Sequence, residues 1–365
     1  MSYLKHKVYG LLFKVFKYTK IKNNQISFII DSDKSFKGNL DYIKREFERR
    51  GEFDFHYFYK DKLSFRAFKN LASSKYIFLN DNFFPLAFMD FKKENIIVQL
   101  WHAPGAFKKF GASTDLESRE ILEKISEKTN YLIITSDYIK DYYSQAFQMP
   151  LSKIYPLGLP RLDYYFENHD TDKLKKNFKA KFNISPEAKV ILYAPTFREN
   201  PIYNNVFDYL DLDEFNNVLG DEYVLALRFH PKIKDFFGDD IKSGGKYIDV
   251  SDFESEQELM LISDLLITDY SSIMIEYSIL NKPIIFFAYD FDNYSNNERG
   301  FYFDFKKTVP GDVVFTSNQL IETIRDGDFS TGNLEDFSKT QFNEIDGRAS
   351  QRIVNFILNN CGENE

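Results

Sequence analysis

The chain has 365 residues and a mass of 43.1 kDa, which is enough for two domains of ordinary size. Hydrophobic residues make up 43% and charged residues 28%, a composition typical of a globular rather than a disordered protein. The net charge of -8 argues against nucleic acid as a general partner. The single cysteine, Cys361, excludes an intramolecular disulfide, and no Cys/His spacing indicates a metal site. We therefore expect a cytoplasmic protein. Because no acidic cluster has clear magnesium-ligand spacing either, we expect that it needs no metal.

The first 22 residues form a basic segment that contains six lysines and no acidic residue. If residues 3–18 are helical, one face carries apolar side chains at helical spacing: Leu4, Val8, Leu11, Leu12 and Val15. Two interpretations stay open. The helix lies on an anionic membrane surface, or it packs its apolar face on the first domain. No apolar run approaches the roughly 20 residues of a membrane-spanning helix.

Twelve short apolar runs predict β-strands, with helical stretches between them. The first six cover residues 26–30, 53–59, 76–79, 96–100, 132–135 and 154–157, and the second six cover 190–193, 224–229, 247–250, 265–268, 284–287 and 313–315. Several runs are apolar on successive residues, as in strands buried on both faces of a parallel sheet. This pattern predicts an α/β protein with two doubly wound Rossmann-like domains that face each other across a cleft. We expect these domains over residues 23–170 and 171–345, with a closing helix and tail over 346–365.

Four segments follow predicted strands directly and carry candidate functional residues. The first, at residues 101–111, contains His102, whose ordinary pKa of about 6.5 suits removal of a hydroxyl proton. Lys108 and Lys109 follow it, where anionic groups would bind. The alternative for His102 is a turn histidine that hydrogen-bonds a backbone carbonyl.

The second segment, at residues 193–198, ends in Arg198, which is suited to a bidentate contact with phosphate. The third, at residues 227–231, places Arg228 and His230 on one side of a strand end, where they would face a leaving diphosphate. Alternatives remain for both segments. Arg198 is then a surface arginine, and Arg228 pairs with an aspartate at the surface beside a buried histidine.

The fourth segment, at residues 264–277, runs from a buried strand into a helix that starts near Ser271 and Ser272. Hydroxyls and backbone N–H groups at a helix start bind phosphate readily. Glu276 follows one turn later and would accept hydrogen bonds from ribose hydroxyls. The alternative is an ordinary serine N-cap with Glu276 in a capping box.

These segments, taken in order with Gly-Leu-Pro-Arg at residues 158–161 and Asn-Lys-Pro at residues 281–283, resemble the CDP-glycerol glycerophosphotransferases of teichoic acid synthesis. The resemblance runs from about residue 96 to residue 294. In the first motif, His-Ala-Pro-Gly stands where His-Gly-Thr-Pro is the commoner form in the family. The resemblance implies a GT-B-like fold, with the acceptor on the N-terminal domain and the CDP-linked donor on the C-terminal one.

The resemblance also implies roles for individual residues. His102 would activate the acceptor hydroxyl, and His230 would assist departure of CMP. The implied donor contacts are Arg161, Thr196, Arg198, Arg228, His230, Ser271, Ser272 and Glu276. The implied partners are CDP-glycerol or CDP-ribitol, a polyprenol-diphosphate-linked saccharide or polymer acceptor, and an anionic membrane surface reached by the N-terminus. This predicts a peripheral protein on the inner face of the cell membrane.

Two other functions stay open at this point. One is a nucleotide-sugar glycosyltransferase of the same architecture, and the other is a non-catalytic scaffold for enzymes of wall-polymer synthesis. The choice between glycerol and ribitol phosphate, between wall teichoic acid and capsule, and between primase and polymerase also stays open, although the modest length favours a primase-like enzyme.

Overall fold

The computed structural model describes residues 3–33, 36–220, 222–230, 247–298, 300–331 and 333–361. The chain divides into two compact units, the first formed by Met1–Phe166 with Thr340–Glu365 and the second by Glu167–Lys339. The expected boundaries were at residues 170 and 345. Pro231, which we expect to end the third motif, lies outside the described residues.

The first unit contains a sheet of six parallel strands, all of which fall on predicted runs. The strands are β1 (Lys22–Ile30), β2 (Asp54–Tyr59), β3 (Ser74–Leu79), β4 (Ile96–Gln99), β5 (Tyr131–Ile133) and β6 (Ile154–Tyr155), in the order β2-β1-β3-β4-β5-β6. The order reverses between β1 and β3, so the crevice outside the carboxyl ends of these two strands is the expected place for a ligand.

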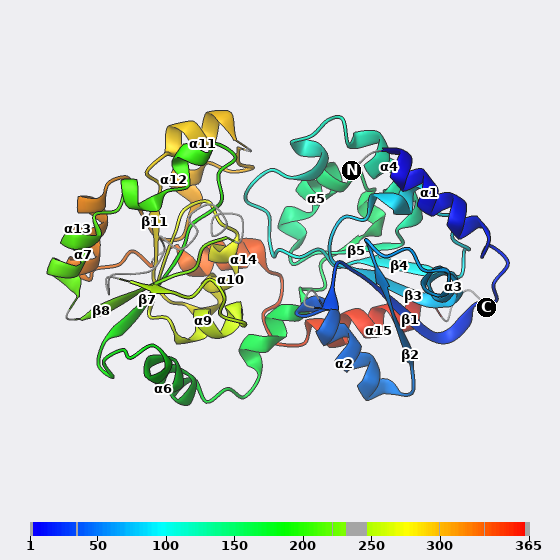
Figure 1. Cartoon of the computed structure of the whole chain (residues 1–365), viewed down its shortest axis with the longest axis horizontal. Helices are drawn as coiled ribbons and strands as arrows, with labels where there is room; N and C mark the ends of the chain where they lie inside the picture. The colour runs from blue at the N-terminus through cyan, green and yellow to red at the C-terminus, as the bar shows by residue number, and fades with distance from the viewer. Residues whose placement is uncertain are drawn as a thin grey trace. The chain divides into compact units, whose positions relative to one another are not determined.

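Helices cover both faces of this sheet. On one face, α2 (Asn39–Arg50) and α15 (Ala349–Cys361) lie side by side (Figure 1) and pack apolar side chains such as Ile43 and Ile353 on β1 and β3. The other face packs against α1 (Tyr3–Lys14), α3 (Phe65–Ser73) and α4 (Arg119–Lys128). The helix α5 (Lys140–Phe147) completes the unit. Strands buried on both faces explain why the apolar runs in the sequence are continuous.

The second unit contains another six-stranded parallel sheet, again on the predicted runs. Its strands are β7 (Lys189–Ala194), β8 (Tyr223–Leu227), β9 (Ile248–Asp249), β10 (Leu265–Thr268), β11 (Ile284–Phe287) and β12 (Asp312–Val314), in the order β12-β11-β10-β7-β8-β9. This is the strand order of a Rossmann sheet, with its reversal between β7 and β10. The prediction of two doubly wound α/β domains is confirmed.

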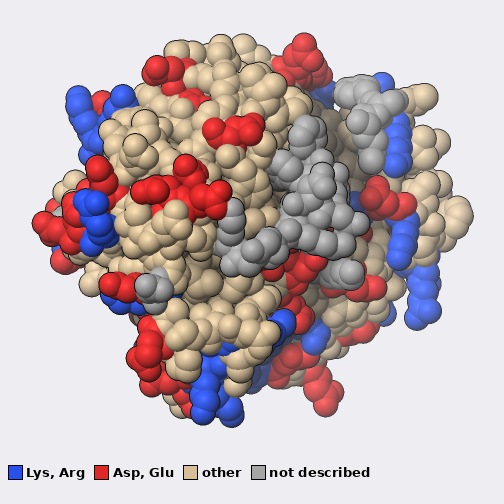
Figure 2. Space-filling model, turned by 60° about the vertical axis from the view of Figure 1, so that its left-hand side comes forward, with Lys and Arg blue, Asp and Glu red and all other residues tan. Residues whose placement is uncertain are grey.

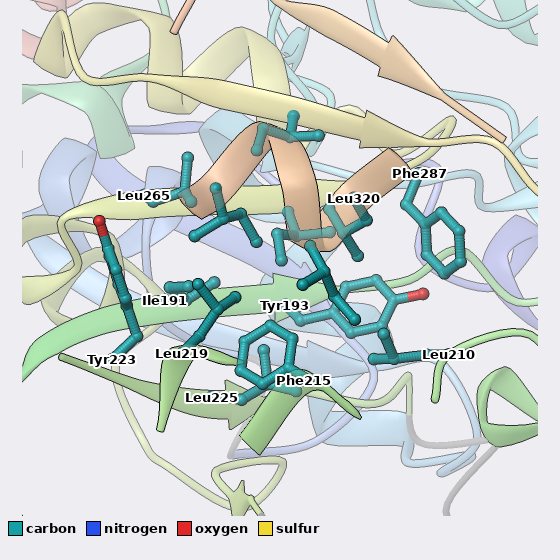
Figure 3. Close-up of a cluster of buried hydrophobic side chains, with 14 of the residues drawn as sticks. Ile191, Tyr193, Leu210, Phe215, Leu219, Tyr223, Leu225, Leu265, Phe287 and Leu320 are labelled. Atoms are coloured by element: carbon teal, nitrogen blue, oxygen red, sulfur yellow. The ribbon is translucent and has the colours of Figure 1, made fainter. Parts of the chain in front are cut away.

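The second unit also contains the helices α6 (Thr171–Lys181), α7 (Leu212–Leu219), α9 (Glu256–Ile262), α10 (Ile273–Tyr277), α11 (Phe291–Asn297), α12 (Phe305–Thr308) and α13 (Ser317–Asp326). The helix α14 (Leu334–Gln341) lies where the chain passes from the second unit back to the first. Figure 3 shows Ile191 and Tyr193 of β7 in one apolar cluster with Phe215 of α7 and Leu320 of α13. Because side chains alternate along a strand, these two residues share one face of β7. The cluster anchors the strand that leads into the second motif.

The N-terminal helix α1 packs on the first unit through a different face from the one we considered. Tyr9 and Phe13 are buried, whereas Leu4, Val8, Leu11 and Val15 are 71%, 40%, 68% and 67% exposed. The larger aromatic side chains bury more apolar area than the aliphatic ones. Leu12, the fifth side chain of the aliphatic face, is partly buried and packs on the core of the first unit. The interpretation that the aliphatic face packs on the domain therefore holds for Leu12 and not for the other four side chains. Among the described residues, no helix is long and apolar enough to cross a membrane.

Candidate active site

Three of the four motif segments meet at one edge of the second sheet. Strands β10, β7 and β8 are neighbours in the order β10-β7-β8, and the segments at residues 193–198, 227–230 and 264–277 leave their carboxyl ends. Because β7 and β10 flank the reversal in strand order, this edge is the expected ligand crevice of the sheet. The sequence placed each segment after a strand, and the sheet order brings them together.

Arg198 lies at the centre of this edge in a completely buried ion network. Its Nε and Nη2 donate to the two carboxylate oxygens of Asp290 at 2.8 Å each, and its Nη1 donates to Asp269 Oδ2 at 2.6 Å. All three side chains have 0% exposure. Although burial lowers the pKa of Arg198, the carboxylates of Asp269 and Asp290 raise it well above its usual value. The guanidinium is therefore charged, and its Nε, Nη1 and Nη2 all donate hydrogen bonds to groups within the protein.

Aromatic rings complete the surroundings of Arg198. Its guanidinium carbon lies 5.0, 5.1 and 5.3 Å from the ring centres of Tyr270, Tyr289 and Tyr294. The Tyr270 hydroxyl donates to Asp290 Oδ1 at 3.0 Å, and burial raises the pKa of Tyr270 far above its usual value. A side chain held in this way cannot reach a ligand without breaking the network. In this structure Arg198 therefore positions the loops at this edge of the sheet through contacts within the protein.

The network fixes the loop that follows β7. The backbone N–H of Thr196 donates to both carboxylate oxygens of Asp269, at 2.9 and 3.0 Å. Its hydroxyl oxygen, Oγ1, is buried and has no hydrogen-bond partner in the described part of the chain. Buried hydroxyls are normally paired, so Thr196 stays a candidate for donor binding.

Arg228 and His230 follow β8 and have different surroundings. The Arg228 Nη1 donates to the carbonyls of Val250 at 3.1 Å and Phe253 at 2.9 Å, and its Nη2 donates to Glu256 Oε1 at 3.2 Å. Arg228 thus holds the 250–256 loop, and the acidic partner is a glutamate rather than the aspartate we considered. His230 is exposed, with its ring centre 5.7 Å from that of Phe197.

The Asp/Ser segment after β10 differs from a simple helix cap. Ser272 is the N-cap of α10, but its side chain makes no capping hydrogen bond to the residues described. Ser271 Oγ accepts from the Ile273 N–H at 3.3 Å, and both serines are partly exposed. Glu276 is 4% exposed within α10. Ser272 therefore does not act as an ordinary side-chain N-cap of α10.

In the first unit, His102 follows β4 in a turn that is under local strain. The preceding residue, Trp101, has φ 58, in the left-handed region that a large side chain rarely adopts. The His102 side chain is 53% exposed, and its Nδ1 lies 3.8 Å from Asp81 Oδ1. Partial desolvation lowers the pKa of His102 below 6.5, an effect that the Asp81 carboxylate opposes. A neutral imidazole beside a carboxylate is suited to take a hydroxyl proton.

Asn39 connects the His102 turn to the Arg161 loop. It is 2% exposed at the start of α2, and its Nδ2 donates to the Trp101 carbonyl at 2.7 Å. Its Oδ1 accepts from the backbone N–H of Arg161 at 2.9 Å. One amide therefore holds both motif loops of this unit, which brings Arg161 to the same end of the sheet as His102.

The residues that follow His102 form a turn at the carboxyl end of the first sheet. Gly105 has φ 61, a conformation that glycine adopts readily, and its N–H donates to Thr135 Oγ1 at 3.0 Å. The Tyr143 hydroxyl donates to the Gly105 carbonyl at 2.7 Å. Lys108 is partly exposed and Lys109 is exposed. The His-Ala-Pro-Gly variant of the motif thus forms an ordered turn that is held by Thr135, just after β5, and by Tyr143 of α5.

Several residues of these two sites were missed by reasoning from the sequence. They are Asn39, Lys60 and Asp81 in the first unit and Asp290 in the second, while Asp269 was noted only as part of its segment. Lys60, Asp81 and Asp290 each stand just after a predicted strand or within a few residues of one, which is a usable signal. Asn39 at the start of a helix gives no such signal.

The architecture matches solved structures of two-domain GT-B-like enzymes. The wall teichoic acid polymerase TagF, solved with CDPG, aligns over 98% of this chain and 94% of its own with a TM-score of 0.82 and 24% identity. The UDP-GlcNAc 2-epimerase of Methanocaldococcus jannaschii aligns over 92% and 99% with a TM-score of 0.56 and 16% identity. At these identities the likeness establishes the fold alone.

The sequence comparisons establish the family. Residues 11–359 match the CDP-glycerol:poly(glycerophosphate) glycerophosphotransferase family, and the chain belongs to it. It is 34% identical to the teichoic acid poly(ribitol-phosphate) polymerase of Bacillus spizizenii, over 96% of this chain and 59% of that protein. It is 33% identical to the teichoic acid glycerol-phosphate primase of Bacillus subtilis, over 78% and 73%. The chain thus spans less than two thirds of the length of the polymerase.

Proposed function

We propose that this protein transfers glycerol phosphate, or a similar polyol phosphate, from a CDP-linked donor to a hydroxyl of a lipid-linked teichoic acid or capsule acceptor. The family match over residues 11–359 carries this proposal. His102 takes the proton of the acceptor hydroxyl, whose oxygen attacks the β-phosphorus of the donor. The bond from that phosphorus to the bridging oxygen breaks, and CMP leaves.

The residues of the second unit support donor binding in this proposal. Thr196, Arg228, His230, Ser271 and Ser272 lie at the carboxyl ends of three adjacent strands, beside the reversal in strand order. Positioned hydrogen-bond donors and cations are what phosphoryl transfer needs most. Glu276, Arg161, Lys108 and Lys109 remain proposed contacts with substrate.

CMP release tests this function. The full chain is mixed with CDP-glycerol or CDP-ribitol and a synthetic lipid-linked disaccharide, and the mass of the product reports the unit added and the number of units. CMP release with either donor supports the proposal. Release of UDP from a UDP-sugar instead would identify a glycosyltransferase, and absence of turnover with specific binding to a partner enzyme would identify a scaffold.

We also propose that transfer needs no resident metal. Among the residues that the structure describes, no group of three His, Cys, Asp or Glu side chains is arranged to hold a metal ion. Arg228, His230 and the helix-start groups at Ser271 and Ser272 stabilise the developing charge instead. Turnover that survives dialysis against EDTA supports this, and turnover restored only by added magnesium contradicts it.

The pH dependence of the reaction should report the environment of His102. Replacing Asp81 by asparagine removes the carboxylate that opposes the lowering of the His102 pKa, so that pKa should fall further. A base acts in its neutral form, so the acidic limb of the kcat/KM profile should move to lower pH. The measurement is kcat/KM between about pH 5 and pH 8. An unmoved limb would show that Asp81 does not act on His102.

The basic N-terminal segment supports peripheral binding to the inner face of the cell membrane. On α1, the exposed aliphatic side chains Leu4, Val8 and Leu11 lie among lysines, a combination typical of helices at a membrane surface. On the face shown in Figure 2, by contrast, acidic and basic side chains are interspersed in small groups among uncharged residues. This distribution also does not favour nucleic acid as a partner.

Removing lysines from α1 and the turn after it should weaken membrane binding. Each lysine near an anionic surface contributes about 1 kcal/mol, so the double variant Lys14→Gln/Lys17→Gln should bind phosphatidylserine vesicles at least about tenfold more weakly. Co-sedimentation with vesicles measures this. The matched control is Lys173→Gln/Lys176→Gln on α6, which should bind as the unaltered protein does. Equal losses in both variants would contradict a specific role of α1.

A further inference from the structure

The first unit contains a cavity of about 530 Å³ at the reversal in its strand order. Asp31 and Asp81, which follow β1 and β3, line the cavity together with Lys60 after β2. His6 and Tyr9 of α1 and the start of α4 complete the lining. A cavity of this size, at the carboxyl ends of parallel strands where their order reverses, is the usual ligand position in such sheets.

The lining of the cavity is acidic. Five carboxylates line it: Asp31, Asp61, Asp81, Asp115 and Glu117. Lys60 Nζ lies 3.1 Å from Asp31 and 3.6 Å from Asp81, and the side chain is 13% exposed. Lys5 Nζ lies 4.0 Å from Asp61. Two ammonium groups beside five carboxylates still leave the net charge negative. Ionised carboxylates only accept hydrogen bonds, so this lining suits hydroxyl donors and repels phosphates.

The α1 side of the cavity adds apolar surface and an incompletely bonded histidine. The rings of Tyr9, Phe83 and Phe84 line the cavity, and such rings pack well on the carbon skeleton of a sugar or polyol. His6 is 7% exposed, and its Nδ1 has no hydrogen-bond partner among residues 3–33, 36–220 and the other described ranges. Buried polar atoms are normally paired, so a hydroxyl group of a ligand would supply the missing hydrogen-bond partner of His6 Nδ1.

Asp81 connects the cavity to the histidine of the first motif. The carboxylate lines the cavity, and its Oδ1 lies 3.8 Å from His102 Nδ1. We propose that the cavity binds the uncharged, hydroxyl-bearing end unit of the acceptor, a polyol or saccharide, and that its carboxylates keep phosphate groups outside. This inference rests on the proposed function and names the chemistry that its acceptor site selects.

The test is direct binding to the full chain without donor, measured by calorimetry. The probes are two synthetic glycerol phosphate trimers, one with a free terminal glycerol and one with a terminal phosphate. The free-ended trimer should bind about tenfold more tightly, because the carboxylates repel the added charge. Ser118→Trp, at the cavity wall, should abolish this binding. The matched control is Glu123→Trp on α4, outside the cavity lining, which should bind normally.

A second variant tests the proposal without depending on the correct folding of the Ser118→Trp protein. Asp61→Asn/Glu117→Gln changes two exposed carboxylates of the lining and should reduce the preference for the free-ended trimer to about threefold or less. Equal binding of both trimers to the unaltered chain would overturn the charge argument. Binding unaffected by Ser118→Trp would overturn the location. Intact binding with no CMP release would instead refute the proposed function and leave the cavity assignment standing.

Discussion

Replacing His102 by alanine should lower kcat/KM by about 10²- to 10⁴-fold, the usual effect of losing a general base. The reason is geometric and electrostatic. The side chain is 53% exposed, its pKa is lowered, and its Nδ1 faces Asp81 at 3.8 Å. Binding of CDP-glycerol should stay within about twofold, because a group that acts on the acceptor proton contributes little to donor affinity. CMP release and calorimetric titration with the donor measure the two quantities.

The matched control is His56→Gln on β2 of the same unit. His56 forms hydrogen bonds through Nε2 with Asp54 Oδ2 at 2.9 Å and through Nδ1 with Asn70 Nδ2 at 3.0 Å. It does not belong to any motif segment. Its replacement should leave kcat/KM unchanged. Because His102 is half exposed, His102→Ala should unfold at nearly the same temperature as the unaltered protein. A folded His102→Ala protein with normal turnover would refute the assignment of the base.

Replacing Arg198 by alanine should lower the free energy of unfolding by about 3–5 kcal/mol. The substitution leaves Asp269 and Asp290 buried without the cation that lies 2.6 and 2.8 Å from them. A buried carboxylate without a counter-charge is far less stable than one that is paired. Urea denaturation followed by circular dichroism measures the loss. A change below about 1 kcal/mol would show that the network is not what stabilises this edge of the sheet.

Two further variants separate the effect of the positive charge of Arg198 from the effect of its bidentate contact with Asp290. Arg198→Lys keeps the cation but cannot form the bidentate contact with Asp290, so its loss of stability should be smaller than that of the alanine variant. Arg325→Ala removes an exposed arginine that pairs with Asp326, and its effect should stay within about 0.5 kcal/mol. If Arg198→Lys is as stable as the unaltered protein, the bidentate geometry contributes nothing.

The Arg198 network shows that a motif residue can be buried in contacts within the protein, which its local sequence does not reveal. From the sequence, an arginine after a strand in a phosphate-binding pattern is expected to touch phosphate. Its partner Asp290 is 92 residues away along the chain, and no local pattern connects the two. Sheet order brings the loops after β7 and β11 to the same edge and buries the pair.

Asn39 and Asp81 illustrate the same limit in the first unit. Asn39 contacts the Trp101 carbonyl from 62 residues away, and Asp81 contacts His102 from the end of a neighbouring strand. The choice of buried side chains on α1 also depends on tertiary contacts. Its sequence contains an aliphatic face and an aromatic one, and only packing against the first unit selects Tyr9 and Phe13 as the buried side chains.

The strands, the two α/β domains and the positions of the motif segments could all be predicted, because apolar periodicity and strand-end residues are local properties of the chain. Which motif residues are exposed at the sheet edge, and which are buried partners that hold them, became clear only from the folded chain. That distinction depends on strand order and on contacts between residues far apart in sequence, which local periodicity does not encode.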